Sequence, residues 1–140
     1  MIEKWLLGHA AAIDFINTIF DIVETWDDLI DKDTDITDAD INAAFRKSLV
    51  DLPRNTFYRE HFERLNPLVE SAIFDWLTAN GMERENDYLE TAYGLKCSGQ
   101  SLIIMSASII GGHEHASQVS DEVRRSGETW RQYIHNMGLV

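Results

Sequence analysis

The sequence predicts an all-α protein, and three observations support this fold class. Apolar residues recur with the spacing of amphipathic helices, and no stretch shows the sustained alternation of apolar and polar residues that is typical of a β-strand. The chain has only 2 prolines in 140 residues. We therefore expect a single helical domain over residues 1–140, a compact bundle of about five or six helices with a long N-terminal amphipathic helix and a buried central helix.

The first helix is predicted over residues 2–31. At about 100° per residue, most of its polar residues fall on one half of the helix surface and the apolar residues listed below fall on the other. The acidic segment 31–40 then ends the helix. The apolar half consists of Phe15, Ile16, Ile19, Phe20, Ile22, Val23, Trp26, Leu29 and Ile30.

The next two helices are predicted from their start and stop signals. Thr37 is a plausible N-cap for a second helix over residues 38–50, because acidic residues follow it in the first turn. A third helix begins near residue 56, and Asn-Pro at residues 66–67 starts it again or kinks it. Asn-Gly at residues 80–81 is a typical C-terminal stop.

The fourth helix is predicted over residues 86–110 and is apolar all round, which indicates the buried central helix. Gly111 and Gly112 end it. Residues 114–136 then form a polar final helix.

The charge limits the classes of partner. The formal net charge is −12, from 24 acidic and 12 basic residues. This balance argues against nucleic-acid binding, which needs clustered Lys and Arg, and against an anionic membrane surface. A divalent cation or a basic protein partner suits it better.

The cellular location is predicted from the cysteine content and the N-terminus. Cys97 is the single cysteine of the sequence. It cannot form a disulfide within the chain, so a reducing compartment is expected. No signal-peptide pattern is visible, and the longest apolar run, residues 102–110, is too short to span a bilayer. We expect a cytoplasmic protein.

Four acids on two turns of the first helix form the leading candidate site. Glu24, Asp27, Asp28 and Asp31 are spaced i, i+3, i+4 and i+7, so they lie on adjoining turns, and Asp27 falls within the apolar half. A charge there needs protonation, an ion pair or a metal. Two readings stay open: a solvated helix end, or a Mg²⁺ site that binds a substrate diphosphate.

A second acidic pair, Asp87 and Glu90, opens the fourth helix. If neighbouring helices are antiparallel, this pair shares one pole of the bundle with the end of the first helix. All six acids would then be metal ligands, and Arg84 would be a phosphate-binding residue at the same pole.

These acidic motifs resemble motifs of two protein families. D-D-L-I-D at residues 27–31 resembles the aspartate-rich helix of class I isoprenoid synthases, and N-D-Y-L-E at residues 86–90 loosely resembles their second motif. The pairs E-T-W-D at residues 24–27 and D-Y-L-E at residues 87–90 are similar in kind to those of MazG-type all-α nucleotide pyrophosphohydrolases. Both resemblances imply an all-α, Mg²⁺-dependent protein that handles diphosphates.

Two function classes therefore remain from the sequence. One is the Mg²⁺-dependent enzyme, in which the metal stabilises charge on the diphosphate. The other is a non-enzymatic accessory protein that binds another protein or forms oligomers, and small acidic helical proteins of this kind resemble phage-encoded accessory proteins. A homo-oligomer is expected because the first helix is predicted to expose a wide apolar face. That face carries Trp5, Phe15, Phe20 and Trp26.

Overall fold

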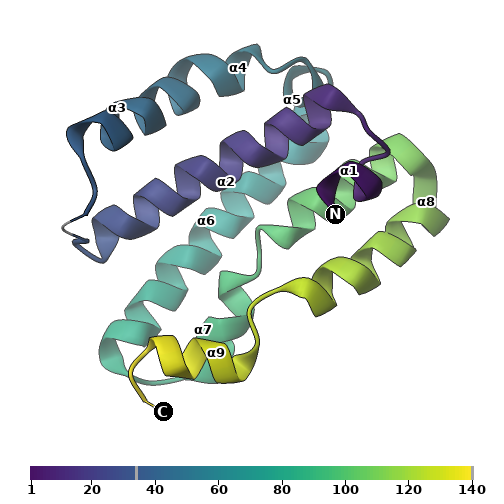
Figure 1. Ribbon diagram of the computed structural model, residues 1–140. Helices are drawn as coiled ribbons and strands as arrows, with labels where there is room; N and C mark the ends of the chain where they lie inside the picture. The colour runs from purple at the N-terminus through teal and green to yellow at the C-terminus, as the bar shows by residue number, and fades with distance from the viewer. Residues whose placement is uncertain (34, 140) are drawn as a thin grey trace. The chain divides into compact units, whose positions relative to one another are not determined.

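A computed structural model of the chain describes residues 1–33 and 35–139. Every regular element in this part of the chain is helical (Figure 1), which confirms the predicted all-α class. The chain divides into two compact units, Met1–Glu63 and Arg64–Val140, called unit 1 and unit 2 below. The prediction of a single domain over residues 1–140 stays a prediction.

Unit 1 contains two long antiparallel arms. The first arm is α2, preceded by the short α1, and the second arm is formed by α3, the π-helix η1 and α4, which run end to end beside α2 (Figure 1). Their bounds are α1 Ile2–Trp5, α2 Ala10–Ile30, α3 Asp38–Arg46, η1 Lys47–Asp51, α4 Leu52–Arg54 and α5 Thr56–Glu60.

The predicted first helix is interrupted near its start. Leu7 and Gly8 have φ values of +50° and +68°, a left-handed conformation that no α-helix continues through. α2 begins after them, and His9 is its N-cap: its Nδ1 accepts a hydrogen bond from the Ala12 N–H at 3.2 Å. The prediction of one helix from residue 2 is therefore wrong at its start, while its end, at Ile30, agrees.

The predicted cap of the second helix is confirmed. The Thr37 hydroxyl accepts a hydrogen bond from the Asp40 N–H at 3.2 Å, and the Asp40 carboxylate accepts one from the Thr37 N–H at 3.0 Å. This is a capping box, which satisfies two backbone donors that the first helical turn leaves open.

An aromatic core holds α5 against the first half of α2. Phe15 and Tyr58 stack with ring centroids 5.1 Å apart, and Phe57 lies 6.2 Å from Phe15. Asn55 caps α5 by accepting the Tyr58 N–H at 2.8 Å, and it also donates to the Ala11 carbonyl at 2.9 Å. One side chain thus starts α5 and ties it to α2.

Unit 2 is built from α6, which begins at the boundary of the two units, and from the three helices that follow. α7 and α9 lie side by side (Figure 1). The bounds are α6 Phe62–Glu85, α7 Leu89–Lys96, α8 Gln100–Ser126 and α9 Trp130–Asn136.

α6 continues past its predicted stop. It runs through Pro67 and past the Asn-Gly pair to Glu85, so the stop at residues 80–81 is wrong. Tertiary contacts hold the extra turn: the Lys96 ammonium of α7 donates to the Asn80 side chain at 2.8 Å and pairs with Glu83 at 3.2 Å. The last residues of α6 are therefore held in the helical conformation by contacts with α7 rather than by their own helix propensity.

The predicted helix over residues 86–110 is divided between α7 and α8, with a turn at residues 97–99. Its second part is well buried, as expected of the central helix, through Leu102, Ile103, Ser106 and Ala107. Gly112, with φ +85° and ψ −178°, interrupts α8, and the chain doubles back there (Figure 1). The Arg124 guanidinium accordingly donates to the side chains of Gln100 and Ser101, at 3.1 and 3.2 Å.

The final helix is also divided, into the second half of α8 and α9. Thr129 caps α9 with a second capping box, completed by Gln132. Over the described residues, no helix combines the length and the apolar character needed to cross a bilayer.

Candidate functional site

Two grooves flank the line of contact between α2 and α3 in unit 1. Thr25 of α2 and Ala44 of α3 line both grooves, so the grooves lie on opposite sides of these two helices. One is polar and acidic, and the other is apolar. They are called the acidic groove and the apolar groove below.

The acidic groove encloses about 350 Å³ and gathers four carboxylates and one ammonium group. Two of the carboxylates, Glu24 and Asp28, belong to the set predicted from the sequence. The sequence reasoning missed Asp21 one turn earlier and Asp40 on the facing helix. The lining residues are Asp21, Glu24, Thr25, Asp28, Ile36, Asp40, Ala43, Ala44 and Lys47.

Two of the four carboxylates of the acidic groove already have partners. Asp21 pairs with Lys47 at 3.0 Å, and Asp40 belongs to the capping box at the start of α3. Two hydrogen bonds with Thr37 lower the pKa of Asp40. The one from the Thr37 backbone N–H has the larger effect, and the one with the Thr37 side chain has the smaller effect. Glu24 and Asp28 are thus the carboxylates of this groove that the fold leaves most open to a ligand.

The other two predicted acids of α2 lie outside the lining of the acidic groove. Asp27 is half-buried, in agreement with its position on the apolar half of the predicted helix, whereas Asp31 is the exposed C-cap residue of α2. Of the i, i+3, i+4, i+7 set, Glu24 and Asp28 therefore line the acidic groove, and Asp27 and Asp31 do not.

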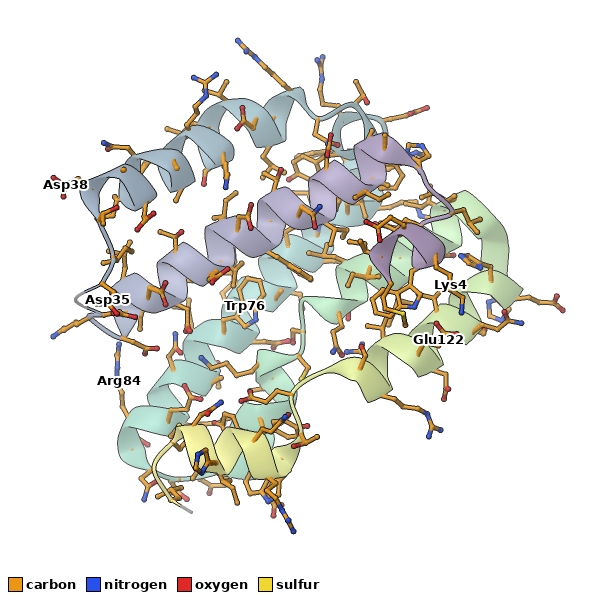
Figure 2. The ribbon with its side chains drawn as sticks, viewed as in Figure 1. Lys4, Asp35, Asp38, Trp76, Arg84 and Glu122 are labelled. Atoms are coloured by element: carbon orange, nitrogen blue, oxygen red, sulfur yellow. The ribbon has the colours of Figure 1, made fainter. Side chains whose placement is uncertain are left out.

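The remaining predicted site residues belong to unit 2. The Asp87 carboxylate accepts a hydrogen bond from the Tyr88 N–H at 2.8 Å, in the turn before α7, and Glu90 lies in the first turn of that helix. Arg84 is exposed in the last turn of α6 and extends from it (Figure 2). The meeting of these residues with the acids of α2 stays a prediction.

The metal prediction also stays untested. In residues 1–33 and 35–139, no group of three or more His, Cys, Asp or Glu side chains is arranged to hold a metal ion. Carboxylates are the ligands that Mg²⁺ prefers, and Mg²⁺ is often held by one or two of them together with substrate phosphates.

The apolar groove encloses about 250 Å³ on the opposite side of α2 and α3. Large apolar side chains stand exposed in it: Leu29 is 41%, Phe45 62% and Leu49 72% exposed. The lining residues are Ile22, Thr25, Trp26, Leu29, Ile41, Ala44, Phe45, Ser48 and Leu49.

The π-helix η1 contributes to the shape of the apolar groove. Ser48 and Leu49 belong to it, and the Ser48 hydroxyl donates back to the Ala44 carbonyl at 2.8 Å, which removes its polar group from the groove. π-helical turns are rare in proteins overall, and those that occur are often found at functional sites. The sequence signal was present, because the apolar-groove residues of α3 and η1 follow the spacing of one helix face.

A polar cluster around Glu83 in unit 2 has a structural role. The Tyr133 hydroxyl donates to the Glu83 carboxylate at 2.7 Å, and Lys96 pairs with the same carboxylate. Burial, together with the hydrogen bond to Glu83, raises the pKa of Tyr133. The cluster joins α6, α7 and α9. Burial also raises the pKa of the Cys97 thiol, which disfavours the thiolate that a nucleophile needs.

Comparison of the sequence with family models, curated proteins and solved structures gives no match.

Proposed function

We propose that this chain is a non-enzymatic binding protein that takes up an apolar segment of a protein partner in the apolar groove. One observation carries the proposal: Phe45 and Leu49, 62% and 72% exposed, lie together in a concave apolar surface. Single exposed apolar residues are ordinary on any protein, but apolar residues that line one groove are typical of an interaction site.

The apolar groove is large enough to support reversible binding. Full burial of a Leu or Phe side chain contributes about 1.5–3 kcal/mol. Covering Leu29, Phe45 and Leu49 would therefore contribute on the order of 5 kcal/mol, before the cost of ordering the partner. A weak, exchangeable complex is expected, which suits an accessory protein. The reducing cytoplasm, where Cys97 would remain a thiol, is the location we propose for it.

The test is titration with a designed helical peptide of about 18 residues, with leucine on one face and glutamine on the other. We expect the peptide to bind and to shift the NMR signals of Phe45 and Leu49. Leu49→Asp should abolish binding, whereas Leu139→Asp, at a leucine 49% exposed outside the groove, should leave it intact. The proposal is refuted if the peptide does not bind, or if it binds Leu49→Asp equally well.

The predicted homo-oligomer is a further proposal for this class of function. Two of the four aromatic residues on which it was based do not support it, because Trp5 and Phe15 are buried, at 8% and 0% exposure. Phe20 and Trp26 retain partial exposure. Light scattering of the whole chain decides this point, since a mass of 16.0 kDa is that of the monomer.

The second candidate function is Mg²⁺-dependent handling of a diphosphate, which the carboxylates of the acidic groove favour. The predicted ligands are Glu24, Asp27, Asp28, Asp31, Asp87 and Glu90, with Arg84 for the phosphate. It takes second place because two of the four carboxylates of the acidic groove, Asp21 and Asp40, already have partners.

The second candidate is tested by metal binding alone. Millimolar Mg²⁺ or Mn²⁺ should raise the melting temperature, because a ligand that binds only the folded state stabilises it. Asp28→Asn should remove this shift, and Asp14→Asn, on the exposed face of α2, should not. A melting temperature that does not respond to either cation excludes this function.

A further inference from the structure

The charge around the apolar groove is concentrated at one end of it. Between residues 27 and 40 the sequence has seven acids and a single base, Lys32. Unit 1 as a whole has 14 acidic and 6 basic residues, a net charge of −8. Figure 2 shows Asp35 and Asp38 at the connection between α2 and α3. A partner that enters the apolar groove therefore meets a strongly negative potential at this end.

The two ends of the apolar groove differ in charge. Leu29 and Ile41 lie at the end next to the acidic connection, whereas Leu49 lies at the other end. Two bases near that other end already have partners: Arg46 lies 4.0 Å from Asp51, and Lys47 lies 3.0 Å from Asp21. The excess charge is thus negative and lies at the connection between α2 and α3, in residues 31–33 and 35–38.

The form of the apolar groove selects a helical occupant. It lies between antiparallel helices, and its α2 residues Ile22 and Leu29 are seven positions apart, which spans about 10 Å or two helical turns. A third helix packs into such a groove through side chains spaced i, i+3 or i+4, and i+7. The occupant's apolar anchors are then expected within two turns.

We propose that the occupant of the apolar groove is a cationic amphipathic helix, whose Lys or Arg residues lie over the acidic loop that joins α2 to α3. This inference rests on the proposed binding function. A second copy of the chain fits less well, because it brings the same excess of acids. An anionic helix would be repelled at the loop end.

The preference for a cationic helix, called the charge rule below, is tested on the whole protein with three labelled peptides. Each peptide has about 18 residues, contains no tryptophan and has the same leucine face. Their polar positions carry Lys, Gln or Glu. By fluorescence anisotropy at low salt we expect the Lys peptide to bind roughly tenfold more tightly than the Gln peptide, and the Glu peptide most weakly. The differences should shrink at an ionic strength of about 0.3 M, where charges are screened more strongly.

Two matched double variants locate the charge effect. Asp35→Asn with Asp38→Asn removes two acids from the loop end, and Glu70→Gln with Glu114→Gln removes two exposed acids of unit 2. The first pair should weaken binding of the Lys peptide about fivefold, and the second should change it less than twofold. Equal losses in both pairs would show a general attraction to the net charge, and would overturn the inference.

The outcomes separate this inference from the function on which it rests. If the three peptides bind equally well and Leu49→Asp abolishes their binding, the groove function stands and the charge rule fails. If no peptide binds, or if the Lys peptide binds Leu49→Asp as well as the unchanged protein, both fail. Circular dichroism of Leu49→Asp confirms that the variant is folded, as expected for a residue 72% exposed.

Discussion

In the first half of α2, Ala12, Phe15, Ile16 and Ile19 are buried, whereas none of the side chains from residue 20 to residue 30 is. The apolar spacing is the same in both halves. The difference arises outside the helix: α5 places Phe57 and Tyr58 against the first half, while α3 covers the second half only in part. Helical spacing thus predicts which residues share a face, and later segments decide what covers it.

The largest expected effect on stability is in the buried half of α2. Phe15 is fully buried and contacts two other aromatic rings, so Phe15→Ala should lower the free energy of unfolding by about 3–5 kcal/mol. Urea denaturation measures it. Phe45→Ala, at a phenylalanine 62% exposed, is the matched control and should cost less than about 1 kcal/mol. Similar costs for both would contradict the contrast between the two halves.

A smaller effect is expected at the helix that partly covers the second half of α2. Thr37→Ala removes a hydroxyl from the capping box of α3 and should cost about 1 kcal/mol. Amide hydrogen exchange should increase in α3 and in the residues of α2 that face it. Thr129→Ala, in the capping box of α9, should increase exchange in unit 2 instead. An increase spread over the whole chain after Thr37→Ala would argue against local opening.

The same cap predicts a response to acid. The pKa of Asp40 is lowered in the folded state by its hydrogen bonds to Thr37. Its contribution to stability is therefore fully present above the ordinary aspartate value of about 3.9 and is lost as the pH falls through the lower folded value. Below about pH 4 the protection of the α3 amides, measured against the exchange rate of an unstructured peptide at the same pH, should fall. Asp40→Asn should weaken this response, and a response unchanged in that variant would exclude Asp40 as its source.

The smallest expected effect on stability is at Leu29, in the exposed half of α2. Because this side chain is 41% exposed, Leu29→Ala should change the free energy of unfolding by less than about 1 kcal/mol. It should nevertheless weaken the binding of the leucine–glutamine peptide, measured by calorimetry. A large loss of stability would mean that the residue belongs to the core rather than to a binding surface.

Local signals in the sequence predicted much of the fold. The cap at Thr37 and the break at Gly112 depend on chemistry within a few residues, and both were found. The errors have tertiary or unusual backbone causes. α6 passes the Asn-Gly stop because Lys96 holds its last turn, and the first helix is broken by a left-handed conformation at Leu7, which a leucine rarely adopts.

The candidate site was less predictable than the fold. Glu24 and Asp28 were recognised as neighbours, but Asp40 joins them only because α3 folds back along α2. Phe45 and Leu49 carry an apolar helical spacing that usually indicates core. Their exposure arises because no other described segment of unit 1 covers them, and no pattern within their own helix encodes that.

The π-helix η1 gives its segment a tolerance to the loss of a residue. A π-helical turn takes in one residue more than an α-helical one, so deleting one residue between 47 and 51 should convert η1 to an α-helical turn and keep the residues that follow in register. Asn55, which reaches the Ala11 carbonyl at 2.9 Å, would then still face α2. Inserting one residue into the α-helical part of α3 should be more damaging, because it would rotate everything that follows by about 100°.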